Sequence, residues 1–218
     1  MKRFLLLLAL GACAPLAMAA DDISKVNGSI HTDAGASYRD LETVNGSIHL
    51  AQGVQARGVE TVNGSINAGD NVRARSMETV NGAIRGGRGL QLDGGVETVN
   101  GSIFIDQGGR VAGGVETVNG SIGLVGTEIG GDVETVNGDI TIGIGSHVKG
   151  GVKVKKPSFN LSLTPPRKPR IVIGPNAVVD GPLVFEREVT LYVHASAAIG
   201  TVSGASVLRF DTDTAPKE

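Results

Sequence analysis

The sequence predicts an all-β protein: a three-sided single-stranded β-helix, or β-solenoid, with coils of 18 or 19 residues. The main observation is a string, Val-Asn-Gly-Ser-Ile or a close variant, that recurs in seven copies 18 or 19 residues apart. These segments are rich in glycine and β-branched residues, which form strands better than helices, and helical repeats are longer, about 33 to 47 residues. The seven copies begin at Val26, Val44, Val62, Val80, Val99, Val118 and Val136.

The composition agrees with this architecture and argues against two others. The 218 residues include 33 glycines but only 8 prolines, in no strict triplet pattern, which excludes collagen. Only 19% of residues are charged and the mean hydropathy is +0.09, whereas disordered chains are more charged and less apolar. A narrow coil with tight corners explains both the abundant glycine and the low aromatic content of 3%.

Residues 1–19 are expected to be a secretory signal peptide. Lys2 and Arg3 precede an apolar run over residues 4–10, and Ala17-Met18-Ala19 provides an A-x-A cleavage pattern. The apolar run is shorter than the roughly 20 residues needed to span a bilayer. We therefore expect an exported protein with no transmembrane span, located in the periplasm, at the cell surface or outside the cell.

Cys13 leaves a second form of processing open. It follows Leu10-Gly11-Ala12 as in a bacterial lipobox, so a lipoprotein acylated at Cys13 is the alternative to simple cleavage. Beyond residue 20 the chain has no cysteine, so disulfides do not stabilise it. Without residues 1–20 the chain keeps 18 basic and 22 acidic residues, a net charge of −4. This balance argues against nucleic acid as a partner.

Each coil divides into three short strands joined by corners. In the second repeat these strands are expected at residues 43–48, 49–54 and 55–60, with alternate residues such as Ile48 and Leu50 pointing inward. Coils stacked about 4.8 Å apart bury these apolar residues and pair each strand with its copies in the neighbouring coils. The pattern fits a coil of either hand.

The regular repeat fills residues 20–152 and then fades. Residues 153–170 are rich in lysine, arginine and proline and are expected to form an exposed basic loop or an interruption of the stack. Residues 171–210 return to an irregular strand pattern and are expected to add coils and a C-terminal cap, which would hide the open strand edges. Residues 211–218 are expected to be a disordered tail. The aromatic residues assigned to the cap are Phe185, Tyr192 and Phe210.

Because the coils superimpose, each repeated residue is expected to form a column along the stack. Asparagine side chains in such a column can join in a hydrogen-bonded ladder. The glycine that follows each asparagine is expected to turn a corner with positive φ. The predicted ladder consists of Asn27, Asn45, Asn63, Asn81, Asn100, Asn119 and Asn137.

A second column is acidic and is the main candidate contact site. Like charges about 4.8 Å apart repel by roughly 0.9 kcal/mol even in water. We therefore expect something to offset the repulsion between neighbouring carboxylates of this column. Solvent and salt could screen the carboxylates if the face is exposed. Divalent cations or a cationic partner could instead neutralise them. No calcium-binding repeat motif accompanies the column, so no metal site is assigned. The column consists of Glu42, Glu60, Glu78, Glu97, Glu116 and Glu134.

The remaining polar residues suggest contact surfaces rather than a catalytic or metal site. His31 and His49 are expected to stack, but no third metal ligand accompanies them. No G-x-S-x-G elbow occurs and no cysteine follows residue 20, so we expect no enzyme and no cofactor. The basic segment is a candidate for contact with an anionic surface such as lipid headgroups. Its charged residues are Lys153, Lys155, Lys156, Arg167, Lys168 and Arg170.

The (E)TVNG(S/D)I unit after a signal peptide resembles the repeat of a bacterial family of adhesin-like β-strand-repeat proteins of unknown function. The match covers about residues 24–152, and residues 171–204 are faintly similar to bactofilin coils, although bactofilins lack a cleavable leader. The resemblance implies a cell-envelope scaffold or adhesin whose partner is a surface protein or polysaccharide. A fibre subunit that self-associates through its coil ends, and a module that binds cations or polymers through the glutamate column, remain alternatives.

Overall fold

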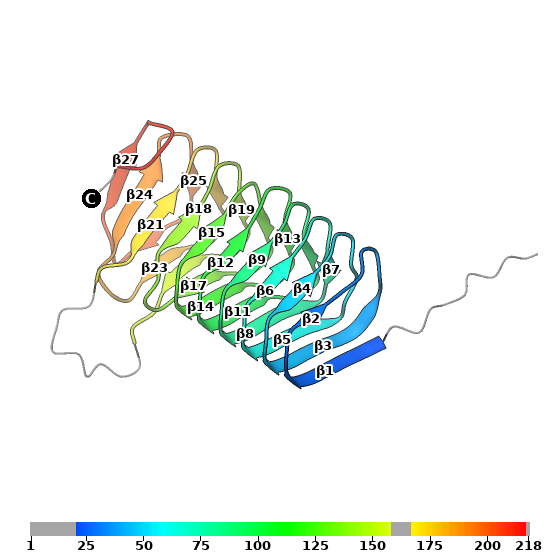
Figure 1. Ribbon diagram of the computed structural model, residues 1–218. Helices are drawn as coiled ribbons and strands as arrows, with labels where there is room; N and C mark the ends of the chain where they lie inside the picture. The colour runs from blue at the N-terminus through cyan, green and yellow to red at the C-terminus, as the bar shows by residue number, and fades with distance from the viewer. Residues whose placement is uncertain (1–20, 158–166, 217–218) are drawn as a thin grey trace, which may run out of the picture.

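The chain winds into a β-solenoid of three parallel sheets, as Figure 1 shows for the computed structural model. The structure describes residues 21–157 and 167–216. The expected signal peptide, Cys13 and the middle of the basic segment lie outside these residues. Sheets A and B each contain ten strands and sheet C contains seven, so the chain makes about ten turns.

In each sheet, strands that are neighbours come from consecutive coils. Sheet A consists of β1 (Asp21–Asn27), β3 (Tyr38–Asn45), β5 (Gly58–Asn63), β8 (Ser76–Asn81), β11 (Val96–Asn100), β14 (Val115–Asn119), β17 (Val133–Thr135), β20 (Val152–Val154), β23 (Leu183–Phe185) and β26 (Val202–Ser203). Sheet B consists of β2 (Ile30–His31), β4 (Ile48–Leu50), β6 (Ile66–Ala68), β9 (Ile84–Gly86), β12 (Ile103–Ile105), β15 (Ile122–Leu124), β18 (Ile140–Ile142), β21 (Arg170–Ile173), β24 (Thr190–His194) and β27 (Val207–Phe210). Sheet C consists of β7 (Arg73–Ala74), β10 (Gln91–Leu92), β13 (Arg110–Val111), β16 (Glu128–Ile129), β19 (His147–Val148), β22 (Val178–Val179) and β25 (Ala198–Ile199).

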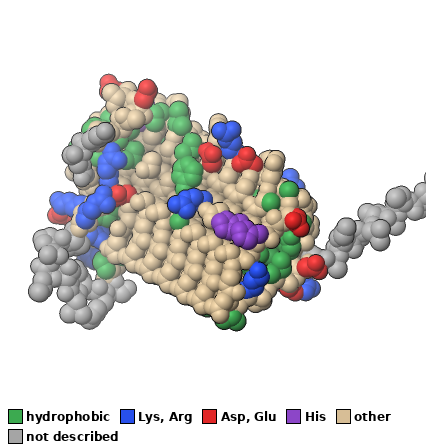
Figure 2. Space-filling view, in the orientation of Figure 1, with side chains coloured by type: hydrophobic (Ala, Val, Ile, Leu, Met, Phe, Trp, Pro, Cys, Tyr) green, Lys and Arg blue, Asp and Glu red, His purple; other side chains and the backbone are tan. Residues whose placement is uncertain are grey.

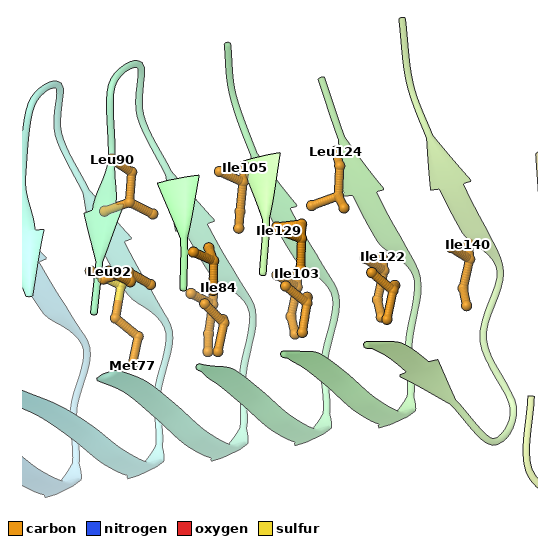
Figure 3. Close-up of a cluster of buried hydrophobic side chains, with 14 of the residues drawn as sticks. Met77, Ile84, Leu90, Leu92, Ile103, Ile105, Ile122, Leu124, Ile129 and Ile140 are labelled. Carbon is orange, nitrogen blue, oxygen red and sulfur yellow. The ribbon is translucent and has the colours of Figure 1, made fainter. Parts of the chain in front are cut away.

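The core is a stack of aliphatic columns between the three sheets. Strand residues alternate between buried and outward positions, and equivalent residues of successive coils pair directly, as Ile48 does with Ile66 and Ile66 with Ile84. Figure 3 shows isoleucine and leucine side chains of successive coils pointing into the same narrow interior. These side chains are fully buried, so each coil completes the core of the next.

The Asn-Gly pair lies at the corner between sheets A and B. The prediction of one continuous strand over residues 43–48 is therefore wrong. β3 ends at Asn45 and β4 begins at Ile48, which leaves Gly46 at the turn. The prediction of positive φ at each glycine that follows an asparagine is wrong as well, because in this column only Gly28 has a positive φ among the described residues. The requirement for glycine is instead steric, because a Cβ on Gly46 would lie 2.3 Å from the carbonyl oxygen of Gly28 in the preceding coil.

Positive φ occurs at a different corner, between sheets B and C. Nearly every coil places one glycine or asparagine there, with φ between 52° and 78°. Asparagine tolerates this left-handed conformation better than other residues with side chains. This column is not among those predicted from the sequence, although the occurrence of Gly or Asn at one repeated position marks it. Its members are Gly35, Gly53, Asn71, Gly89, Gly108, Gly126, Gly145 and Asn176.

Sheets A and B are continuous on the two sides of the basic segment. β20 pairs with β23 and β18 pairs with β21, so sheets A and B continue in register across residues 155–169. Phe185 and Phe210 are almost fully buried, whereas Tyr192 lies on the outer side of sheet B beneath the guanidinium of Arg170. Among the described strands, β26 and β27 form the C-terminal edges of sheets A and B.

Candidate functional site

The asparagine side chains form a continuous ladder along the first seven coils. The Nδ2 group of each asparagine donates to the Oδ1 atom of its counterpart in the preceding coil at 2.9–3.0 Å. The ladder ends at Asn137, where the guanidinium of Arg187 donates to Oδ1 at 2.6 Å and to the carbonyl oxygen of Val136 at 3.1 Å. Arg187 thus takes the place of the next asparagine.

A buried threonine column supports the same corner from inside. Thr61 is 4% exposed, and its hydroxyl donates to the carbonyl oxygen of Gly46 at 2.8 Å. Four other threonines make the equivalent bond to the preceding corner glycine. These hydroxyls satisfy carbonyls that the turn leaves without a strand partner. This role is not among the predictions from the sequence, although a threonine recurs between the glutamate and the valine of each Glu-Thr-Val segment.

The glutamate column stands on the outer face of sheet A in exact register. Glu42, Glu60 and Glu78 pair directly across neighbouring strands, and the series continues to Glu134. Ser24 precedes the column and Lys153 follows it. Within residues 21–157 and 167–216, no ion pair involves the five carboxylates from Glu42 to Glu116.

The glutamates form one wall of a groove that runs along the stack. In each Glu-Thr-Val segment the threonine points inward, so glutamate and valine stand on either side of it on the outer face. The groove has a volume of about 620 Å³ and extends from Ser24 to Glu134 and Lys155. The valines of the opposite wall are 37–41% exposed from Val44 to Val118. The groove is therefore acidic along one side and aliphatic along the other.

Burial, together with repulsion between neighbouring carboxylates, raises the pKa of two glutamates in the column. Desolvation is the largest cause for Glu60, followed by repulsion from Glu78 and Glu42. Desolvation is also the largest cause for Glu116, where Glu134 and Glu97 add repulsion and Lys155 partly offsets it. Both shifts have the sign expected for like charges on one face.

At its C-terminal end the column is neutralised by the chain itself. Lys153 forms ion pairs with Asp132 at 2.5 Å and with Glu134 at 3.1 Å, and the ammonium of Lys155 pairs with the second oxygen of Glu134. Glu134 is only 8% exposed as a result. The hydrogen bond from Lys153 lowers the pKa of Asp132. Lysine side chains are therefore the cations that close the groove.

The other basic residues of the segment also have partners within the chain. Arg167 pairs with Asp139 at 2.8 Å and Lys168 with Glu188 at 2.7 Å, while the guanidinium of Arg170 donates to the carbonyl oxygen of Pro216 at 2.9 Å. The backbone of Lys156 donates to Glu186. Basic side chains gather around the C-terminal coils in Figure 2, but they face carboxylates there.

The histidine pair lies on the outer face of sheet B, over its first two strands (Figure 2). The rings of His31 and His49 stack in parallel, with centroids 4.6 Å apart. His147 is separate and bonds Asp180 at 2.7 Å. Among the described residues, no group of three or more histidine, cysteine, aspartate or glutamate side chains is arranged to hold a metal ion. The same part of the chain has no long apolar helix of the kind that crosses a membrane.

Comparison of the chain with protein-family models, with curated proteins and with solved structures finds no significant match. The β-solenoid implied by the family resemblance is present. The assignment to an adhesin-like repeat family and the likeness to bactofilins gain no support from these comparisons.

Proposed function

We propose that the protein is an exported, non-enzymatic scaffold or adhesin of the bacterial cell envelope, which holds a partner along the groove of sheet A. The observation that carries this proposal is the row of five outward carboxylates, which have no ion-pair partner among the described residues, beside a row of exposed valines. A rigid stack keeps both rows in place over six coils. Such a surface is suited to contact with a long partner rather than to catalysis at one point.

Location and envelope binding can be tested in two experiments. Fractionation of cells that express the full chain is expected to place the protein in the envelope or the medium, and removal of residues 1–19 is expected to retain it in the cytoplasm. The processed chain is then mixed with isolated envelopes and sedimented. We expect it to sediment with them, and to do so at least tenfold less when Glu60, Glu78 and Glu97 are replaced by glutamine.

The matched control changes the net charge equally but leaves the groove intact. Asp93, Asp211 and Asp213 are exposed and lie outside the groove, so the triple variant D93N/D211N/D213N is expected to bind as the unmodified protein does. Equal loss of binding in both triple variants would show that net charge alone governs attachment and would contradict the proposal.

A fibre subunit is the second candidate, favoured by the two ends of the stack. β1 forms one edge of sheet A, and β26 and β27 form the opposite edges of sheets A and B among the described strands. Leu208 in β27 is 47% exposed. Edge strands of this kind can pair head to tail in an open filament. Sedimentation velocity decides the question, because a chain that stays monomeric at high micromolar concentration is not a fibre subunit.

A further inference from the structure

We infer that the occupant of the groove is an extended polypeptide segment in which basic and aliphatic residues alternate. This inference rests on the proposed function, since it names the partner of the same groove. It depends on three observations: the charge of one wall, the apolar character of the other, and the way in which the chain closes the groove with its own lysines.

The charge of the groove favours a cationic partner over an anionic or neutral one. Five carboxylates from Glu42 to Glu116 face outward without an ion-pair partner in the described part of the chain. A second copy of sheet A would bring a further row of carboxylates to the interface, so a copy of this face cannot neutralise the first. Basic side chains supply the opposite charge and donate charge-assisted hydrogen bonds to carboxylate oxygens.

The opposite wall favours a partner with apolar side chains. The five valines from Val44 to Val118 are 37–41% exposed, although most β-branched residues of the repeat are fully buried. They stand two residues from the glutamates on the same strands, so a partner that lies in the groove contacts both rows at once. An extended polypeptide has side chains on two opposite sides, alternating with every residue. Alternation of lysine or arginine with aliphatic residues directs one kind to each wall.

The length of the groove defines the length of this segment. Seven rows from Ser24 to Glu134 line it, and six steps of about 4.8 Å give roughly 29 Å. An extended chain advances about 3.4 Å per residue, so eight or nine residues fill the groove. Four of these are basic, which comes close to the number of carboxylates that lack a partner.

The chain itself provides an example of the contact between basic side chains and this column. β20 has the sequence Val-Lys-Val, and it continues with Lys155. Lys153 and Lys155 are separated by Val154, and both ammonium groups reach Glu134 while Val154 is buried. Two lysines on the outer face of one strand thus satisfy the last carboxylate of the column, while Val154 between them belongs to the core of the stack. We infer that the partner does the same for the preceding five.

The probe for this inference is the labelled octapeptide KVKVKVKV, with binding to the processed chain measured by fluorescence anisotropy. Two peptides serve as comparisons: KKKKVVVV has the same composition without alternation, and KSKSKSKS has the same charge spacing without aliphatic residues. We expect KVKVKVKV to bind at least tenfold more tightly than either comparison peptide. We also expect its binding to weaken with added salt, because the carboxylates are exposed.

Two groove variants and a competitor identify the contacts. E60Q/E78Q/E97Q is expected to weaken KVKVKVKV binding at least tenfold. V62T/V80T/V99T keeps β-branched residues on the strands and is expected to abolish the preference over KSKSKSKS. D93N/D211N/D213N is expected to bind as the unmodified protein does, and circular dichroism verifies that all variants are folded. Comparable binding of the three peptides, or full displacement by spermine at equal charge, would overturn the inference.

The result also separates this inference from the proposed function. Loss of envelope binding in E60Q/E78Q/E97Q together with no peptide preference would mean that the groove acts but holds a different occupant. Envelope binding that is unaffected by E60Q/E78Q/E97Q would contradict both the function proposed for the groove and the occupant inferred here.

Discussion

At the scale of single residues, the corners of the coil are stabilised by short contacts between neighbouring coils. Six asparagine bonds and five threonine bonds each join a residue to the coil before it. A net contribution of about 0.5 to 1.5 kcal/mol for each bond makes these columns a substantial part of the stability of a domain. Their loss is measurable one residue at a time.

Replacement of Asn81 by alanine is expected to lower the free energy of unfolding by about 1 to 3 kcal/mol. Asn81 donates to Asn63 and accepts from Asn100, so the change removes two ladder bonds of about 0.5 to 1.5 kcal/mol each. Asn27 begins the ladder and makes only the bond from Asn45, so Asn27→Ala is expected to cost about half as much. Urea denaturation measures both values, and equal losses for the two variants would contradict a ladder that acts bond by bond.

The two kinds of corner glycine are expected to respond differently to substitution. A Cβ on Gly101 would lie 1.8 Å from the carbonyl oxygen of Gly82, so Gly101→Ala must push two coils apart and is expected to cost more than about 3 kcal/mol. Gly53 has φ of 71° and only distant neighbours, and Asn71 occupies the same corner in the next coil. Gly53→Asn is therefore expected to cost less than about 1 kcal/mol. Thermal unfolding of both variants tests this order, and the reverse order would rule out steric contact as the cause.

At the scale of elements, the glutamate column opposes the pairing of the sheet A strands. The raised pKa values of Glu60 and Glu116 mean that the folded state holds these protons more tightly than the unfolded chain does. Such groups favour folding at acidic pH, and this contribution is lost as the pH rises through the folded-state pKa. Aspartates with lowered pKa, such as Asp132, have the opposite dependence, so the effect of the column is isolated by substitution.

Replacement of Glu60 by glutamine is expected to stabilise the protein at pH 7 by about 1 kcal/mol at low salt, since it removes the desolvation cost of the charge and the repulsion from Glu78 and Glu42. The gain is expected to decline as the pH falls through the folded-state pKa and to vanish below the ordinary glutamate value of 4.5, where the carboxyl is neutral. Urea titrations of both proteins at several pH values provide the measurement. Salt is expected to reduce the gain at pH 7. A gain that is constant with pH would mean that charge is not its cause.

The sequence is informative about the elements to different degrees. The period of the repeat predicts the coils, the inward isoleucines and the asparagine and glutamate columns, because each follows from equal spacing alone. It does not predict why Gly46 is glycine, since that depends on the distance between two coils. It also does not predict that Lys153 and Lys155 close the glutamate column, because these residues lie where the repeat has ended and only the register of β17 with β20 brings them to Glu134.

At the scale of the whole molecule, the stack is a one-dimensional array. Strand pairing joins each coil only to the coil before it and the coil after it, so stability is approximately a sum of coil and interface terms. The length of the groove is set in the same way, by the number of coils that carry the Glu-Thr-Val segment. The number of coils is therefore expected to be adjustable without loss of the fold, provided that the register is kept.

Deletion of residues 81–99 removes one coil in phase, because it joins Val80 directly to Asn100 and restores the sequence Glu-Thr-Val-Asn-Gly-Ser-Ile. We expect this protein to fold, with a denaturant m-value about a tenth lower, since one of about ten turns is lost and m follows the surface exposed on unfolding. Deletion of residues 81–90 removes about half a coil, brings sheet A residues against the wrong sheet and is expected to prevent folding. Circular dichroism and urea denaturation compare the two deletions. If both proteins fold equally well, or both fail to fold, strand register between coils is not what specifies this structure.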